Sequence, residues 1–209
     1  MGRGWRNRDS QRGRRSGFST TPKRRILVVC EGKQTEPGYL KGFHQKHRSN
    51  VLVVEVVSAS GNPMTMVEEA IRLRDAAIQR ANREGDPFLA YEATWCVFDC
   101  DQHARIPEAI QKANGNSIRL AISNPCFELW LLLHFRDNPG QQLGNRMCEL
   151  LREHVPKYSK RVRYSVYAHG YEQAVKRAQK IDQDATDANE EGRNPSTTVY
   201  LLTEEIRAG

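Results

Sequence analysis

The sequence predicts an α/β fold in which a mostly parallel four-stranded sheet is flanked by helices and followed by a C-terminal helical extension. Between residues 25 and 122, short apolar runs of strand length alternate with segments whose apolar residues recur at helical spacing. Beyond residue 139 the patterns are helical. Strands separated by helices of this length are typical of right-handed crossovers in a parallel, Rossmann-like sheet.

The four predicted strands are rich in β-branched and aromatic residues. They cover residues 25–30 (RILVVC), 51–57 (VLVVEVV), the first part of 93–101 (ATWCVFDCD) and 117–122 (SIRLAI). A Glu-Gly pair ends the first strand, and an Asn-Gly-Asn turn precedes the fourth. Each run is therefore bounded by residues that favour a change of direction.

Three predicted helices begin at residues that favour helix starts. Thr35 can cap a helix that reaches residue 47. Asn124 and Asn194 each precede a proline and predict two more starts, the first opening an apolar helix of about 11 residues. The spacing of apolar residues predicts the other helices over residues 64–83, 106–114, 143–154 and 171–187.

The basic charge of the chain is concentrated at its beginning. The first 25 residues hold eight Arg and one Lys against one Asp, a local charge of +8, so residues 26–209 carry −1 of the total of +7. With little apolar content this tail should be disordered when free, and Arg12, Arg14 and Arg15 suit contacts to phosphates. A solubilising extension without a partner and a transit peptide are the alternatives. We therefore divide the chain into a basic tail (1–24), an α/β domain (25–136) and a helical extension (137–209) packed on the same core.

The cysteines and the hydropathy of the sequence indicate the cellular compartment in which the protein is expected. The five cysteines form no CxxC pair, and Cys30, Cys96 and Cys126 lie inside apolar runs, where cysteine behaves as a small core residue. A reducing, cytoplasmic setting is expected. Without an apolar run of about 18 residues or a secretory signal, neither export nor a membrane span is expected.

Two carboxylates follow the third strand. Asp99 and Asp101 alternate with Cys100, so their side chains should point the same way. Two like charges about 4 Å apart repel by roughly 4 kcal/mol at an effective dielectric of about 20, and a hard divalent ion such as Mg²⁺ offsets that repulsion. The alternative is a solvated strand-to-loop turn, where Asp is common.

A third acidic residue interrupts the apolar helix after the fourth strand. An unpaired buried carboxylate costs several kcal/mol, so Glu128 should meet an Arg or Lys, accept backbone donors or bind a metal. His134, near the other end of that helix, is expected to be a hydrogen-bonded core histidine. Further on, the basic segment 156–167 could touch phosphates through Lys160, Arg161 and Arg163, with a solvated loop as the alternative.

Four motifs carry a resemblance to a known family. EGKQTEPGYL (31–40), VFDCD (97–101), SNPCFELWLLLHF (123–135) and NPSTTVYLL (194–202) resemble the motif series of the RloB-like family. These small proteins are linked to restriction-modification and phage-defence loci, often beside an RloA-type ATPase. The resemblance implies a Toprim-like α/β domain, in which a Glu after the first strand and a DxD after the third bind a divalent ion. Here those residues are Glu31, Asp99 and Asp101, while the middle residue of the DxD, often basic in the family, is Cys100.

The resemblance and the residue pattern together predict a nuclease dependent on Mg²⁺ or Mn²⁺ that cleaves phosphodiester bonds in DNA or RNA during antiviral defence. Glu36 or Glu128 would be a further ligand or the base that activates water. His44, His47 or His103 could protonate the leaving group. The competing interpretation is a non-catalytic nucleic-acid-binding or regulatory subunit that works through a neighbouring ATPase; homo-oligomerisation stays open.

Overall fold

The computed structural model describes residues 23–48, 52–59, 61–100 and 106–209, which form an α/β fold around one five-stranded sheet. The strand order is β2-β1-β3-β4-β5. The strands are β1 (Arg24–Cys30), β2 (Leu52–Ser58), β3 (Ala93–Asp99), β4 (Arg119–Asn124) and β5 (Ser196–Thr197). The first four pair in parallel, and β5 is antiparallel to β4. The predicted fold class is confirmed, but the predicted number of four strands was too small by one.

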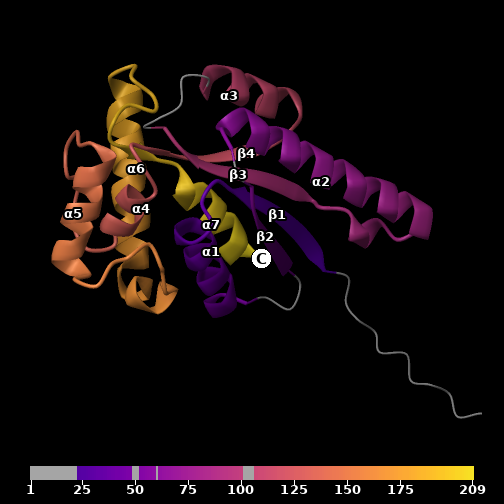
Figure 1. The fold of residues 1–209 in the computed structure, drawn as a ribbon, viewed down its shortest axis with the longest axis horizontal. Helices are drawn as coiled ribbons and strands as arrows, with labels where there is room; N and C mark the ends of the chain where they lie inside the picture. Colours follow the sequence, from indigo (N-terminus) through magenta and orange to yellow (C-terminus); the bar gives the residue numbers. More distant parts are fainter. Residues whose placement is uncertain (1–22, 49–51, 60, 101–105) are drawn as a thin grey trace, which may run out of the picture.

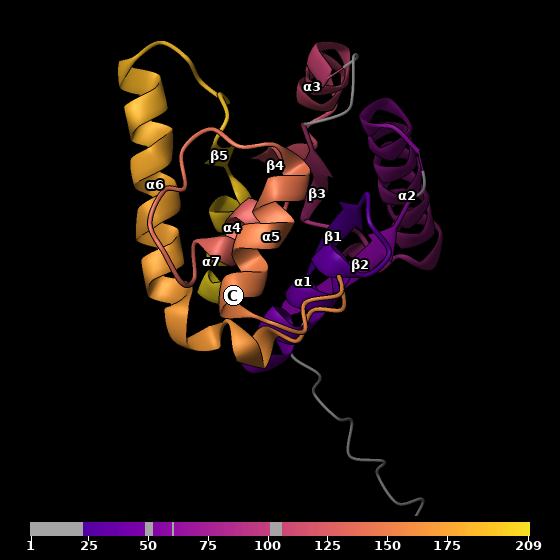
Figure 2. The ribbon, with the colours of Figure 1, turned by 60° about the vertical axis from the view of Figure 1, so that its left-hand side comes forward.

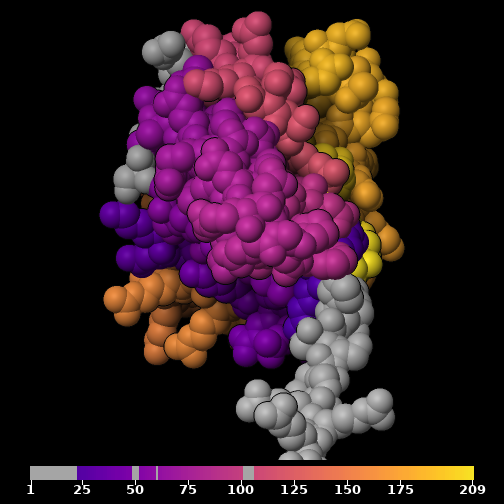
Figure 3. Space-filling model, turned by 90° about the vertical axis from the view of Figure 1, so that its right-hand side faces the viewer, coloured from indigo at the N-terminus to yellow at the C-terminus, as the bar shows by residue number. Residues whose placement is uncertain are grey.

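Helices cover both faces of the sheet. They are α1 (Thr35–Lys46), α2 (Pro63–Glu84), α3 (Ile106–Gly115), α4 (Glu128–Leu132), α5 (Gly144–His154), α6 (Tyr171–Asp187) and α7 (Val199–Ala208). Figures 1 and 2 show α2 and α3 on one face and α1 and α7 on the other, with α4, α5 and α6 grouped on the α7 side. In Figure 3 the α2 face is turned to the viewer, and α3 lies above α2.

The alternation of side chains along the strands divides the core into two clusters. Val28 and its neighbours at even positions of β1 pack with α1, α4, α5, α6 and α7, whereas Val29 packs with α2 and α3. Both side chains are fully buried. A central parallel strand covered on both faces is expected to be apolar throughout, as RRILVVC is after its first two residues.

The C-terminal extension contributes to the same core as the sheet. Met147 of α5, Ile181 of α6 and Leu202 of α7 belong to the cluster that contains Val28. The extension also supplies β5, so it is not purely helical. The boundary predicted at residue 136 stays a prediction. Among the described residues, no helix is long and apolar enough to cross a bilayer.

The three predicted helix starts differ from the structure for one reason, because each capping side chain is used elsewhere. Thr35 is the first residue of α1 and donates its hydroxyl to the carbonyl of Lys160 at 3.2 Å. Asn124 is the last residue of β4, where its side-chain amide donates to the carbonyl of Gly192 at 2.8 Å and its backbone pairs with Ser196, so α4 begins later, at Glu128, and is shorter than expected. Asn194 bonds the backbone of Gln142 through its side chain, and α7 begins at Val199.

Candidate functional site

The carboxyl ends of β1, β3 and β4 meet at one edge of the sheet, beside a pocket of about 450 Å³. Its wall is formed by residues 32–36, Asp99 at the end of β3, residues 127–128 at the start of α4, and residues 159–160. We call it the carboxylate pocket, because Glu36, Asp99 and Glu128 line it. The carboxyl ends of strands are where open α/β sheets bind ligands.

Glu31 and Asp99 lie next to each other beside this pocket. The backbone amide of Glu31 donates to the carbonyl of Val97 at 3.0 Å, which extends the pairing of β1 with β3 by one residue. The backbone amide of Asp99 in turn donates to Oε2 of Glu31 at 3.2 Å. Two of the three predicted metal ligands therefore lie together. Asp101, the third, lies outside the described residues.

Glu36 is buried in the first turn of α1. Its residue is 5% exposed, and Oε2 has no hydrogen-bond partner in the part of the chain that the structure describes. A Cβ at Gly32 would lie 2.1 Å from that oxygen, so a side chain at position 32 would displace the carboxylate. Burial, together with the charges of Glu128 and Glu31, raises the pKa of Glu36 above its ordinary range.

Glu128 is equally buried, at 4% exposure, and its partner is a phenol. The Tyr158 hydroxyl donates to Oε1 of Glu128 at 2.6 Å. Across the described residues, no ion pair holds Glu128 or Glu36. The Arg or Lys partner considered for Glu128 is thus not found there. Burial and the Glu128 charge raise the pKa of Tyr158.

Basic side chains line the rim of the carboxylate pocket. Lys33 and Lys160 are exposed and belong to its wall. Lys160 is held there because its carbonyl accepts the Thr35 hydroxyl. Of the other predicted phosphate contacts, Arg163 lines a neighbouring groove and Arg161 is exposed on the segment between them. The predicted contacts Arg12, Arg14 and Arg15 are outside the described residues.

Sequence reasoning missed Tyr158 and Lys33. Tyr158 is 30 residues from its partner Glu128 and lies in a segment without periodicity, so no local signal relates the two. Lys33 stands in the EGKQTE motif between the two glutamates, and that position was the available signal.

The donor set suits a hard cation, although its geometry is incomplete. Carboxylate oxygens are the ligands that Mg²⁺ takes, and a buried Glu36 oxygen without a partner is available for one. In residues 23–48, 52–59, 61–100 and 106–209, however, no three side chains of ligand type are close enough together to hold a metal ion. A site with three carboxylates at this edge therefore requires Asp101.

The described histidines lie away from the carboxylate pocket. His44 lines a surface pocket beside β2, and the His47 ring lies tilted against Phe43 with its Nε2 3.2 Å from the Tyr164 hydroxyl. His134 is 3% exposed and is bonded through its two ring nitrogens to the Tyr39 hydroxyl and the Trp130 carbonyl. The prediction of a hydrogen-bonded core histidine is confirmed. His103 lies outside the described residues.

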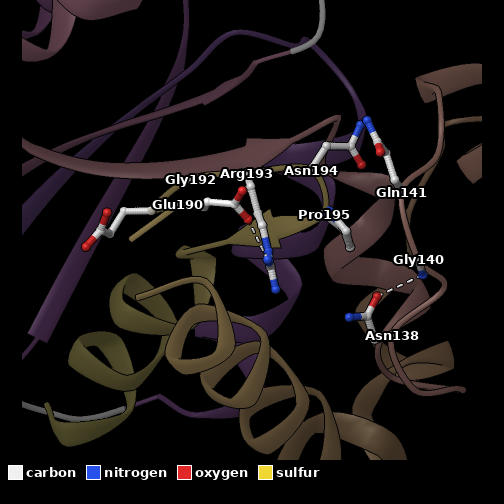
Figure 4. A pocket seen from close by; sticks show the side chains of 9 residues that line it. Asn138, Gly140, Gln141, Glu190, Gly192, Arg193, Asn194 and Pro195 are labelled. Atoms are coloured by element: carbon white, nitrogen blue, oxygen red, sulfur yellow. Dashed lines mark hydrogen bonds and ion pairs between the residues drawn. The ribbon is translucent and has the colours of Figure 1, made fainter. Parts of the chain in front are cut away.

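A second, larger pocket of about 670 Å³ opens between residues 138–141 and 190–195. Figure 4 shows that two pairs of its polar groups bond each other. Arg193 pairs with Glu190 at 2.7 Å, and the Gly140 amide donates to the Asn138 side chain at 2.8 Å. Its acidic side chains are exposed. The carboxylate pocket, with buried acids at the strand ends, is therefore the stronger candidate.

Comparison with known proteins gives one match. The family model described as "RloB-like protein" matches residues 26–206, which run from the third residue of β1 into α7. No curated protein and no solved structure matches the chain.

Proposed function

This chain belongs to the RloB-like protein family, and from that membership and the carboxylate pocket we propose that it is a nuclease dependent on a divalent metal ion. The substrate is DNA or RNA, and the reaction is hydrolysis of a phosphodiester bond. The observation that carries the proposal is that Glu31 and Asp99 lie side by side at the ends of β1 and β3, at the edge of a pocket that the buried acids Glu36 and Glu128 also line.

The order of acidic residues along the fold supports this proposal. A Glu after β1 and an Asp at the end of β3 occupy the positions that the Toprim-like resemblance assigns to metal ligands. Two further glutamates, Glu36 and Glu128, are buried without an ion pair within the described residues, and burying a carboxylate in its charged form costs several kcal/mol. A bound cation would offset that cost.

Glu31, Asp99 and Asp101 would hold the ion, with Glu36 or Glu128 as a further ligand. Mg²⁺ or Mn²⁺, when bound, polarises the phosphate and lowers the pKa of a bound water. Lys33 and Lys160 at the rim would attract the phosphate backbone. Where Glu128 is that further ligand, Glu36, whose pKa is raised, retains its proton to higher pH than an ordinary glutamate and can deliver it to the departing oxygen.

Family membership also suggests the biological context. The RloB-like proteins are linked to restriction-modification and phage-defence loci, so we place the activity in prokaryotic antiviral defence, with an RloA-type ATPase as the partner. The segments with exposed cations described above suit a nucleic-acid substrate.

A cleavage assay tests this function. The full chain is incubated with plasmid DNA, single-stranded DNA and RNA in Mg²⁺ or Mn²⁺, beside Asp99→Asn and the control Asp184→Asn, which changes an exposed acid on α6. We expect cleavage by the unchanged chain and the control, and none by Asp99→Asn or in EDTA. Binding without cleavage, also in the presence of the partner ATPase, would instead indicate a non-catalytic nucleic-acid-binding subunit.

A further inference from the structure

A groove of about 730 Å³ runs along α1 and is closed on its other side by residues 162–168. We call it the α1 groove. The apolar part of its lining, which we call its floor, includes Gly38 and Gly42 of α1 together with Val162 and Ala168. Its basic residues are Lys41, Lys46 and Arg163.

Close backbone packing forms the groove. A Cβ at Gly42 would lie 2.7 Å from Cβ of Tyr164, and a Cβ at Gly38 would lie 2.9 Å from the carbonyl oxygen of Val162. Two glycines one helical turn apart therefore let the 162–168 segment lie directly on α1. The long side chains beside them, Lys41 and Lys46, stand at the edges of this contact and remain exposed.

The charge of the groove has one sign. No Asp or Glu lines it, and within the described residues no ion pair holds Lys41, Lys46 or Arg163. An adjoining pocket on the other side of Lys41 adds Arg48 and again contains no acidic residue. Unpaired cations along a groove with an apolar floor match a polyanion that also carries flat apolar groups, as nucleic acids do.

The α1 groove and the carboxylate pocket are lined by neighbouring stretches of the same two chain segments, residues 32–46 and 159–168. The segment that closes the groove begins beside Lys160, which lines the carboxylate pocket and is tied to α1 by the Thr35 hydroxyl. Arg163, three residues further on, lines the groove. A chain of phosphates lying along α1 would thus meet cations from Lys46 to Lys160 and end at the acidic residues.

The burial of those acids selects the form of nucleic acid. Glu36 and Glu128 are 5% and 4% exposed, so a phosphate has to enter the pocket to approach them. Duplex DNA is stiff, with a persistence length of about 150 base pairs, so its backbone does not bend locally into a recess of this kind without a cost in deformation energy. A single strand can follow a narrow groove and place one phosphate in such a pocket.

We propose that the α1 groove binds the backbone of a single-stranded nucleic acid and guides one of its phosphates into the carboxylate pocket. This inference rests on the proposed function for the fate of that phosphate, but the binding itself requires neither metal nor cleavage. Lys41 and Lys46 contact phosphates, and the contact is independent of sequence.

Binding of a fluorescein-labelled oligothymidylate in EDTA tests the groove separately from catalysis. The full chain is compared with the double variant Lys41→Glu/Lys46→Glu and with the control Lys176→Glu/Lys180→Glu, which changes the same net charge on exposed positions of α6. We expect the groove variant to bind about tenfold or more weakly, with a salt slope smaller by about 1.4 for two lost phosphate contacts. The control should stay within about threefold.

Equal weakening of both variants, or tighter binding of a duplex than of the single strand, would overturn the proposal. Far-ultraviolet circular dichroism establishes that each variant is folded.

A second measurement on the unchanged chain needs no variant: an oligonucleotide that contains 4-thiothymidine is photocrosslinked, and the labelled peptides are identified by mass spectrometry. Crosslinks in α1 and residues 160–168 are expected, and crosslinks confined to other parts of the chain would refute the groove. If the unchanged chain binds the single strand through the groove but does not cleave it in Mg²⁺ or Mn²⁺, only the nuclease proposal is contradicted.

Discussion

The hydrogen bond between Tyr158 and Glu128 allows a direct test of whether the carboxylate pocket holds a charged side chain. Tyr158→Phe removes the hydroxyl and keeps the ring, so it deletes the 2.6 Å bond to Oε1 of Glu128 with little change in volume. The deletion leaves a buried carboxylate with one donor fewer.

The cost follows from the charge of the acceptor. A hydrogen bond to a charged group stabilises a protein by about 1.5 to 3 kcal/mol, and a neutral one by about 0.5 to 1.5 kcal/mol. Tyr158→Phe should therefore lower the free energy of unfolding by about 2 kcal/mol in the unchanged chain. In a Glu128→Gln background, where the acceptor is a neutral amide, it should cost about 1 kcal/mol, which gives a coupling of about 1 kcal/mol.

Urea denaturation in EDTA at pH 7 measures the four proteins of this cycle. Tyr200→Phe is the matched control, because Tyr200 donates to Asp182 at 2.9 Å outside the pocket and its loss should be the same in both backgrounds. The reasoning would be refuted if Tyr158→Phe cost the same with glutamate as with glutamine at position 128. A loss of 3 to 5 kcal/mol in Glu128→Gln alone, as for a broken buried ion pair, would equally refute it.

Three further predictions concern pH and the N-terminal residues. Because burial and the charges of Glu128 and Glu31 raise the pKa of Glu36, the folded protein binds more protons than the unfolded chain above about pH 4.3, so stability in EDTA should fall as pH rises there. Urea denaturation at a series of pH values should show that the free energy of unfolding falls less steeply with pH in Glu36→Gln. An equal slope in the variant would contradict this prediction. Burial lowers the pKa of His134 to about 3, so stability should fall as pH drops below about 6.5, by up to about 1.4 kcal/mol per pH unit. Stability of the His134→Gln variant should not show this fall below about pH 6.5, and an equal slope in the variant and the unchanged chain would contradict the prediction. Deleting residues 1–22, which leaves β1 intact, should reduce the salt slope of nucleic-acid binding by about 0.7 to 0.9 for each phosphate contact that is lost. An unaltered slope would show that the arginines within residues 1–22 contact no phosphates.

The sequence predicted those parts of the fold and site that depend on regular patterns. Runs such as RILVVC and ATWCVFD indicated strands, and the helix predicted over 171–187 has the bounds of α6. The proximity of Glu31 and Asp99 was predicted because the carboxyl ends of adjacent parallel strands meet at one edge. These inferences depended only on the spacing of apolar residues or on the position of a strand end, and required no knowledge of contacts between distant side chains.

The remaining features depend on contacts between distant segments. β5 is two residues long and exists because Ser196 pairs with Asn124, which an Asn-Pro pattern cannot reveal. Tyr158 reaches Glu128 across 30 residues, and its position depends on how the extension folds over the sheet. The α1 groove depends on Gly38 and Gly42, whose role emerges only with the segment that packs on them.

Binding of Mn²⁺ to the full chain, followed by electron paramagnetic resonance, tests most directly the claim that the carboxylate pocket is a divalent-cation site. The measurement compares the unchanged chain with Asp99→Asn and with the exposed-acid control Asp184→Asn. We expect saturable binding by the unchanged chain and the control, and loss of that binding in Asp99→Asn. Saturable binding that Asp99→Asn leaves intact, or no binding at millimolar Mn²⁺ by the unchanged chain, would contradict that claim.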